Sequence, residues 1–230
     1  MANSPVTHRV RFAIMLGPLA LASCIAGGEQ QRVEAPQQRS AAPRVAARPA
    51  YQPPMTPNQC FAELKAADVR FSPLADRSED GGCRTIDTIK LLDFGTPTTN
   101  LGAMTCPLAK NFAAWARYAV IPAAQVYLGE KVVKIETMGS YSCRNIYGGR
   151  SGRLSQHAFA NAVDVSAFVL ADGRRISVEK NWNGSAKERA FLEALHTSAC
   201  RRFGTVLGPE YNAAHYNHFH FDMSGNGYCR

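Results

Sequence analysis

The segment His215-Tyr-Asn-His218-Phe-His220-Phe-Asp222, near the C-terminus, predicts a short strand with two chemically different faces. Phe219 and Phe221 alternate with His218 and His220, and successive side chains of a strand point to opposite faces. We therefore expect both phenylalanines to face a core and both imidazoles to face the other way, as a metal site requires. Two incidental surface histidines are the alternative, which this segment alone does not exclude.

A second segment, Ser155-Gln-His157-Ala-Phe-Ala-Asn-Ala-Val-Asp164-Val-Ser166, predicts another half-buried strand, because valines alternate with polar residues toward its end. Asp164 would project from the polar face, and His157 lies just before the strand. Together with His220 they supply three ligands of the types that bind zinc, with a fourth position left for water, as in catalytic zinc sites. A turn aspartate and a strand-capping histidine are the alternative, and the two segments taken together favour the metal site.

The pattern Ser155-x-His157-x6-Asp164 followed by His218-x-His220 resembles the LAS zinc metallopeptidases, which include D-alanyl-D-alanine carboxypeptidases, dipeptidases and penicillin-insensitive murein endopeptidases. The sequence around these motifs resembles the bacterial extensin-like C-terminal family, which is related to those peptidases. The segments that carry this resemblance are Tyr141-Ser-Cys143-Arg144, Leu154 to Asp164, Cys200-Arg-Arg-Phe203 and Leu207-Gly-Pro209. The resemblance covers about Thr56 to Arg230.

The resemblance implies that Zn²⁺ is held by His157, Asp164 and His220. Arg144, after a turn at Gly139-Ser-Tyr141, resembles the arginine that LAS enzymes place beside the scissile carbonyl, where it would stabilise the oxyanion. A surface arginine is the alternative. His218 is the first candidate for the general base, because the pKa of histidine lies near the operating pH.

The dipeptidase and carboxypeptidase branch has a glutamate three residues before its ligand, and this chain has Asn217 there. This departure favours the endopeptidase-like pattern and leaves the general base open. Ser155, Glu210 and His215 are candidates for contacting substrate or supporting the ligands. His196 is expected to be a packing or surface residue rather than a ligand.

Residues 1–24 predict a lipoprotein signal peptide, with Arg9 and Arg11 before an apolar run at 12–22 that is too short to span a membrane. The ending Leu21-Ala-Ser-Cys24 resembles a lipobox, in which Cys24 would carry lipid; an ordinary signal peptide ending near Ala22 is the alternative. Ile25 is not the aspartate linked to inner-membrane retention, so we expect an exported protein anchored by lipid at the periplasmic face of the outer membrane.

Residues 25–55 are rich in Gln, Arg, Ala and Pro and predict a disordered tether. Two net positive charges lie in the signal and two in the tether, which leaves +4 of the total +8 on residues 56–230. Such a mild excess does not indicate nucleic-acid binding, and it suits an anionic cell envelope. Residues 56–230 have a suitable length for one domain.

Six cysteines lie in residues 56–230, and an exported domain with an even number is expected to form three disulfides. They are Cys60, Cys83, Cys106, Cys143, Cys200 and Cys229. Of the fifteen possible pairings, we favour Cys60–Cys83 as a local link and Cys200–Cys229 as a tie for the tail.

The coarse pattern predicts an α+β domain, LAS metallopeptidase-like and disulfide-stapled, in which an antiparallel sheet carries the site and helices cover its back. Helices are expected at 56–67, from Pro107 to a break or kink at Pro122, and from the capping box at Ser185 to Phe203. Strands are expected at 84–94, 131–137, 163–170, 176–178 and 218–222.

These features predict an envelope-anchored, zinc-dependent peptidase that cleaves D-Ala-containing bonds of peptidoglycan stem peptides, in the manner of a DD-endopeptidase. The protein is expected to be a monomer that meets the membrane through its N-terminal lipid and does not bind nucleic acid. A non-catalytic lipoprotein that binds the cell wall or a metal is the alternative.

Overall fold

A computed structural model describes residues 55–149, 151–225 and 227–230. The expected signal peptide, the lipidated Cys24 and all but the last residue of the expected tether lie outside the described residues. Within the described part, no helix has the length and apolar character needed to cross a membrane.

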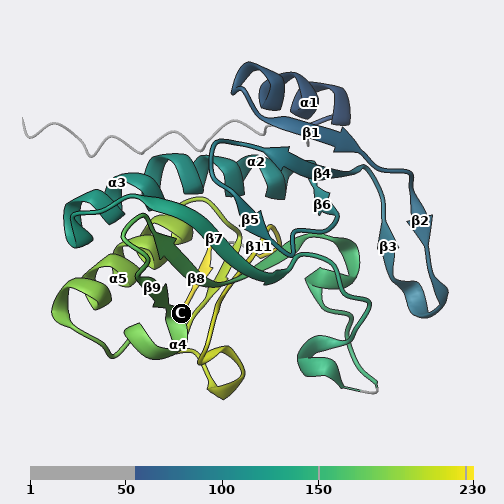
Figure 1. Cartoon of the computed structure of the whole chain (residues 1–230). Coiled ribbons are helices and arrows are strands. Elements are labelled where there is room, and N and C mark those ends of the chain that lie inside the picture. The colour runs from purple at the N-terminus through teal and green to yellow at the C-terminus, as the bar shows by residue number, and fades with distance from the viewer. Residues whose placement is uncertain (1–54, 150, 226) are drawn as a thin grey trace, which may run out of the picture. The chain divides into compact units, whose positions relative to one another are not determined.

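The described residues form an α+β domain (Figure 1). Its helices are α1 (Pro57–Ala66), α2 (Cys106–Trp115), α3 (Ile121–Ala123), α4 (Val178–Asn181) and α5 (Ala186–Cys200). Its strands are β1 (Arg70–Pro73), β2 (Arg77–Ser78), β3 (Arg84–Thr85), β4 (Thr88–Asp93), β5 (Thr98–Thr99), β6 (Met104–Thr105), β7 (Val132–Gly139), β8 (Ala162–Leu170), β9 (Arg175–Ser177), β10 (Thr205–Leu207), β11 (Phe219–Asp222) and β12 (Tyr228–Cys229).

The described strands form a seven-stranded main sheet, a three-stranded sheet and a two-stranded hairpin. The main sheet has the order β12-β10-β11-β8-β7-β5, with β9 paired to β8, and the small sheet has the order β1-β4-β6. The hairpin β2–β3 projects away from the main sheet (Figure 1). The expectation of an antiparallel main sheet is correct for its central pairs but wrong at its edges, where β5 and β12 pair parallel to their neighbours.

Strand β8 contains an irregularity that strict alternation did not predict. Val165 pairs with Thr137 and Ala167 pairs with Glu136, so two steps along β8 match one step along β7. This is a β-bulge, which shifts the side-chain alternation of the strand by one residue. Phe168 consequently packs in the same core as Val165, on the face opposite Asp164.

The helical segment after Pro107 continues past the expected break. The wider π-helical turns Ala116–Val120 and Ala124–Leu128 flank α3, which contains Pro122. Proline has no N–H to donate to the preceding turn, and π turns are a common way for a helix to absorb such an irregularity. The segment ends at Gly129, whose left-handed φ of 70° a residue with a side chain rarely adopts.

Other boundaries differ slightly from those expected. The strand predicted at 84–94 is interrupted at Asp87, which has a positive φ of 50°, so it becomes β3 and β4. The strand predicted at 176–178 ends at Ser177, which caps α4 by accepting a hydrogen bond from the N–H of Lys180. The predicted capping box at Ser185 is confirmed, although α5 ends at Cys200 rather than at Phe203.

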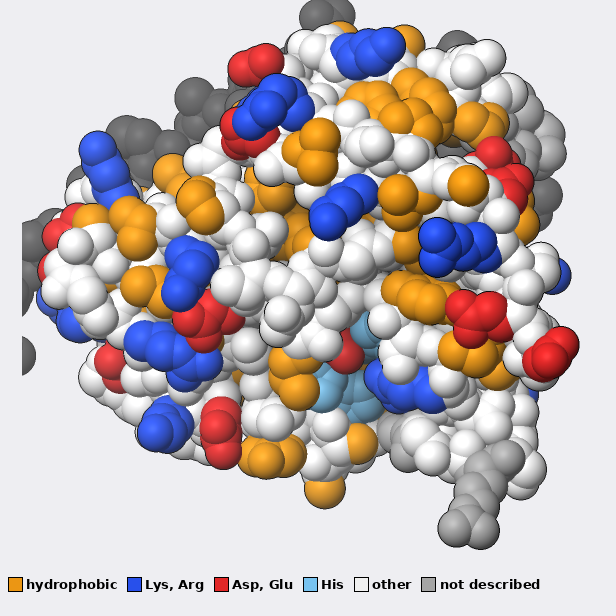
Figure 2. All heavy atoms as spheres, turned by 45° about the vertical axis from the view of Figure 1, so that its right-hand side comes forward, with side chains coloured by type: hydrophobic (Ala, Val, Ile, Leu, Met, Phe, Trp, Pro, Cys, Tyr) orange, Lys and Arg blue, Asp and Glu red, His pale blue; other side chains and the backbone are white. Residues whose placement is uncertain are grey.

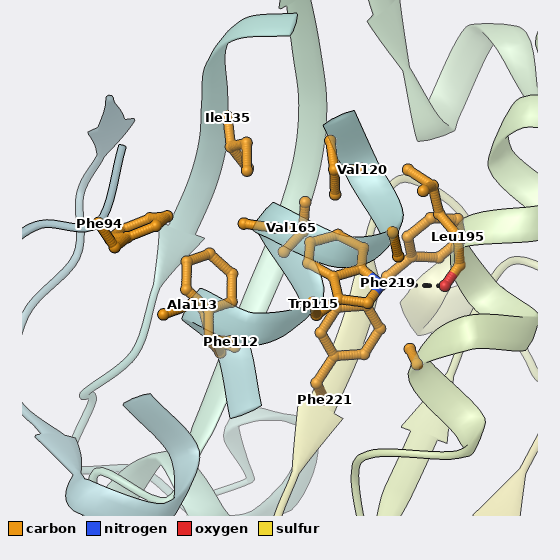
Figure 3. Packing of buried hydrophobic residues seen from close by; sticks show 14 of the residues in the cluster. Phe94, Phe112, Ala113, Trp115, Val120, Ile135, Val165, Leu195, Phe219 and Phe221 are labelled. Atoms are coloured by element: carbon orange, nitrogen blue, oxygen red, sulfur yellow. Dashed lines mark hydrogen bonds between the residues drawn. The ribbon is translucent and has the colours of Figure 1, made fainter. Parts of the chain in front are cut away.

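The core lies between the helices and the apolar face of the main sheet (Figure 3). The ring of Trp115 from α2 lies 5.0 Å from that of Phe221 on β11, and its Nε1–H donates to the carbonyl oxygen of Leu195 in α5. Phe219 and Phe221 are both fully buried. The predicted division of β11 into an apolar face and an imidazole face is therefore confirmed.

Three disulfides join the six cysteines of the described domain. Cys200–Cys229 is confirmed, and it links the end of α5 to β12. The favoured Cys60–Cys83 link is wrong, because the bonds are Cys60–Cys106 and Cys83–Cys143. The chain carries Cys83 out on the β2–β3 hairpin, whereas Cys60 in α1 meets the first residue of α2.

Truncation of Phe221 is expected to destabilise the sheet that carries the imidazoles. Phe221→Ala removes a fully buried ring stacked 4.8 Å from that of Phe203, and such changes cost about 3–5 kcal/mol of unfolding free energy. Urea denaturation with the disulfides intact measures this loss. Leu92→Ala is the control, because Leu92 is 55% exposed and should change the unfolding free energy by less than about 0.5 kcal/mol. Equal losses in the two variants would contradict the assigned core.

Candidate metal centre

The pairing of β8 with β11 places two of the three expected ligands opposite each other. His220 and Asp164 are register partners in this antiparallel pair, and side chains of such partners lie on the same face with their Cβ atoms about 5 Å apart. Both side chains are buried, and His220 Nδ1 lies 2.9 Å from Asp164 Oδ1.

The third expected ligand, His157, comes from a 3₁₀ helix that precedes β8. Ser155 caps this helix (Gln156–Phe159), because its side-chain oxygen accepts the N–H of His157 at 3.3 Å. The chain leaves the helix through Ala160, which has a left-handed φ of 52°. Ser155 is buried and holds the backbone of His157, a candidate ligand, in place.

The side chains of the three candidate ligands meet in one compact cluster. His157 Nε2 lies 3.1 Å from Asp164 Oδ2 and 3.2 Å from His220 Nδ1. His220 Nδ1 in turn lies 2.9 Å from Oδ1, the other oxygen of the same carboxylate. A tetrahedral zinc with bonds of about 2.0–2.1 Å has ligands separated by roughly 3.3 Å. The donor set and its spacing therefore fit a zinc ion with three protein ligands.

Asp222 has a role that the sequence interpretation missed. Its Oδ2 lies 3.0 Å from His220 Nε2, while its Oδ1 accepts hydrogen bonds from the N–H and the hydroxyl of Ser224. A carboxylate that accepts the second N–H of a ligating histidine fixes the ring and its tautomer. The signal was present, because Asp222 is two residues after His220 and therefore on the same face of the strand.

Hydrogen bonds and charges within the cluster shift the pKa values of Asp164 and His220 in the direction opposite to burial. Burial alone would raise the pKa of Asp164, but hydrogen bonds from His157 and His220 hold it well below its usual range. Burial likewise disfavours a charged His220, yet its hydrogen bonds to Asp164 and Asp222 raise its pKa to about 9. Two carboxylates thus maintain a strong preference for positive charge at this point, which a divalent cation also satisfies.

His218 lies beside this cluster without belonging to it. Its Nε2 is 3.7 Å from Asp164 Oδ1, and its Nδ1 is 2.8 Å from the side-chain oxygen of Asn217. If Nδ1 carries the proton and donates it to this amide oxygen, Nε2 is left as a proton acceptor. Burial lowers the pKa of His218, so the ring is neutral at neutral pH.

His215 forms the next layer behind His218. Their ring centroids are 5.1 Å apart, and His215 Nδ1 lies 2.8 Å from the side-chain oxygen of Asn212. Burial, with smaller contributions from the neighbouring His218 and His220, lowers the pKa of His215 to about 4. The His215 ring centroid also lies 5.9 Å from that of the candidate ligand His220, and its role there stays a prediction.

Asp164, His215, His218, His220 and Asp222 line a cavity of about 490 Å³, within the usual range for ligand sites, whereas His157 is not part of its lining. Figure 2 shows histidines at the bottom of this hollow, with acidic and basic side chains beside them. The lining comprises Arg144, Ile146, Gly148, Arg153, Leu154, Ser155, Gln156, Asp164, Leu207, Tyr211, Ala214, His215, His218, His220, Asp222 and Ser224. Glu210 does not line it and is exposed.

Arg144 approaches the cluster from one wall, with its Nη2 3.9 Å from Asp164 Oδ2. The β2–β3 hairpin supports this wall at two points, through the Cys83–Cys143 disulfide and a 2.6 Å hydrogen bond from Tyr141 to Glu79. The residue next to Arg144 is therefore covalently fixed to a second part of the domain.

His196 lies elsewhere, as expected. It packs against Trp182 and Phe219, with ring centroids 6.0 and 5.5 Å away, on the apolar side of β11. It is a packing residue and contributes nothing to the cavity.

The chain thus forms an α+β domain with three disulfides and a buried cluster of two histidines and one aspartate beside a cleft. The family model described as "Extensin-like protein C-terminus" matches residues 58–230, well over half of the chain. The chain therefore belongs to the extensin-like C-terminal family. No curated protein and no solved structure matches it significantly.

Neutralising Asp222 is expected to weaken zinc binding. Asp222→Asn keeps the shape of the side chain but removes the charge that faces His220, and loss of such a partner typically costs 10–100-fold in metal affinity. Competition with a chromophoric chelator at fixed pH measures the affinity. Asp172→Asn, in the exposed turn before β9, is the matched control and should bind zinc like the parent protein. Unchanged affinity in Asp222→Asn would show that Asp222 does not orient His220.

Proposed function

We propose that this protein is an exported zinc-dependent peptidase that cleaves D-Ala-containing bonds of peptidoglycan stem peptides, in the manner of a DD-endopeptidase. The observation that carries the proposal is the convergence of His157, Asp164 and His220 within a cleft, with ligand atoms 2.9–3.2 Å apart. We also propose that the LAS metallopeptidases are distant relatives, on the basis of the shared ligand pattern.

Zinc bound by these three residues would supply a Lewis acid and lower the pKa of a water molecule to about 7. His218 is the general base in this proposal, because its ring is neutral and its Nε2 lies 3.7 Å from Oδ1 of the candidate ligand Asp164. Nε2 accepts a proton from the attacking water, and Asn217 holds the ring from behind. The side-chain oxygen of Asn217 thus orients the ring of His218, as the carboxylate of Asp222 orients the ring of His220.

Arg144 completes the proposed centre. Its guanidinium donates hydrogen bonds to the oxygen of the scissile carbonyl as negative charge develops there. The water oxygen forms a bond to the carbonyl carbon, and the C–N bond then breaks. The proton held by His218 passes to the leaving amine, so a carboxylic acid and an amine result and His218 is neutral again. The acid then passes its remaining proton to the amine, which leaves a carboxylate and an ammonium group.

The proposed location follows from the N-terminal sequence. A lipid on Cys24 and a tether over residues 25–55 would place the domain at the periplasmic face of the outer membrane, within reach of the cell wall. Stable attachment needs more than one acyl chain, which a lipoprotein anchor provides. The protein would act there as a monomer on peptidoglycan, with no nucleic-acid partner.

Removal of the metal or of a ligand is expected to abolish cleavage. The purified domain should release new muropeptides from cross-linked peptidoglycan, lose this activity with a chelator and regain it with zinc. Asp164→Ala should reduce the rate by more than about 100-fold, above the loss typical of a residue that only supports a ligand. Chromatography of the released muropeptides measures the rate.

Asp172→Ala is the control, because Asp172 lies in an exposed turn and pairs only with Arg174 among the described residues. It should cleave like the parent protein. Cleavage that survives both the chelator and Asp164→Ala would refute the proposed centre. Stoichiometric zinc without any muropeptide release would instead support the non-catalytic binding lipoprotein.

A further inference from the structure

A second arginine lies in the wall that carries Arg144. The residues Asn145 and Leu154 form an antiparallel bridge, and the N–H of Ile146 donates to the carbonyl oxygen of Arg153. Residues on either side of a bridged pair point to the opposite face from that pair. Arg144 and Arg153 therefore share one face of this small ladder, and both line the cavity.

The carboxylates of the cavity offset the positive charges of this wall only weakly. Asp164 is engaged by His157 and His220, and Asp222 is engaged by His220 and Ser224. The nearest carboxylate oxygen to Arg144 is 3.9 Å away, too long for a hydrogen bond. Arg153 makes no ion pair with any other described residue of the domain.

The zinc centre proposed above would increase this excess of positive charge. Two carboxylates balance one divalent cation, which leaves the two guanidinium groups of Arg144 and Arg153 as net charge in a cleft of about 490 Å³. Clefts lined by one sign of charge concentrate ligands of the opposite sign. A guanidinium presents a planar pair of donors that matches a carboxylate in two-point contact.

We propose that Arg153 forms an anion subsite, which selects peptides with a free carboxylate on the residue that follows the scissile amide. The proposal rests on the peptidase function, in which Arg144 contacts the scissile carbonyl. Arg153 then lies further along the same wall, where it reaches the neighbouring residue of the substrate. In D-Ala-containing stem peptides, the carbon attached to the amide nitrogen carries such a carboxylate.

The test compares two synthetic peptides that differ in one group. One is an acetylated peptide that ends in D-Ala-D-Ala with a free carboxylate, and the other is the same peptide as its C-terminal amide. The parent protein should cleave the acid at least about tenfold faster, as measured by kcat/KM, because a hydrogen bond to a charged group contributes about 1.5–3 kcal/mol. Arg153→Gln should lose this preference, because its kcat/KM falls much more on the acid than on the amide.

Two further variants separate local recognition from charge and folding. Arg153→Lys keeps the charge but not the two-point geometry, so it should recover only part of the preference. Arg201→Gln removes the same charge from an exposed position beyond α5 that does not line the cavity, and it should retain the full preference. An acid preference that survives in Arg153→Gln would overturn the proposal.

Equilibrium binding of both peptides to the metal-free protein is also measured. This measurement separates a failure of the Arg153 subsite from a failure of the peptidase function. Tighter binding of the acid that depends on Arg153, without cleavage of either peptide, would keep the subsite and refute hydrolysis. Equal cleavage and equal binding of the two peptides would keep hydrolysis and refute the subsite. Inorganic phosphate serves as a competitor, and binding of phosphate through Arg153 that is tighter than binding of the acid would overturn the assignment to a carboxylate.

Discussion

The candidate site depends on the antiparallel pairing of β8 with β11, which sets Asp164 opposite His220. A slip of β11 by one residue against β8 would turn His220 into the core and bring Phe219 or Phe221 to the cleft. The register is held from the other face, where Phe219 and Phe221 are fully buried against the helices. The apolar half of each strand therefore fixes the position of the polar half.

The cluster also buries several ionisable side chains close to one another. Asp164, Asp222, His157 and His220 are all buried, and such groups persist only when they are paired or bind a cation. Each carboxylate meets at least one imidazole, and the resulting network prefers a positive centre. Disulfides at the edges, among them Cys83–Cys143 beside Arg144, restrain the walls around this network. The fold thus keeps a set of candidate metal ligands preorganised beside an open cleft.

The sequence was most informative where one physical rule acted alone. The alternation around Phe219 and Phe221 correctly predicted which face of β11 is buried, and the capping box at Ser185 correctly predicted the start of α5. The grouping of His157, Asp164 and His220 was predicted from their ligand chemistry and then supported by the resemblance to known metallopeptidases, because nothing in local periodicity brings residues 63 positions apart together.

The missed features each depend on tertiary geometry. Cys83 lies closer in sequence to Cys60 than to Cys143, but the β2–β3 hairpin carries it to the wall of the cleft. The bulge in β8 cannot be detected from β8 alone, because it arises from the mismatch with β7. Arg153 was not singled out, because its place in the cavity wall results from a bridge between two loop segments.

X-ray absorption spectroscopy of the zinc-loaded domain tests the central claim most directly, because it reads the atoms bound to the ion. The account predicts one zinc per chain in a four-coordinate shell of nitrogen and oxygen atoms at about 2.0–2.1 Å, with the scattering of two imidazoles. It also predicts that one imidazole contribution disappears in His220→Ala. A shell that contains sulfur, or one that is unchanged in this variant, would contradict the account.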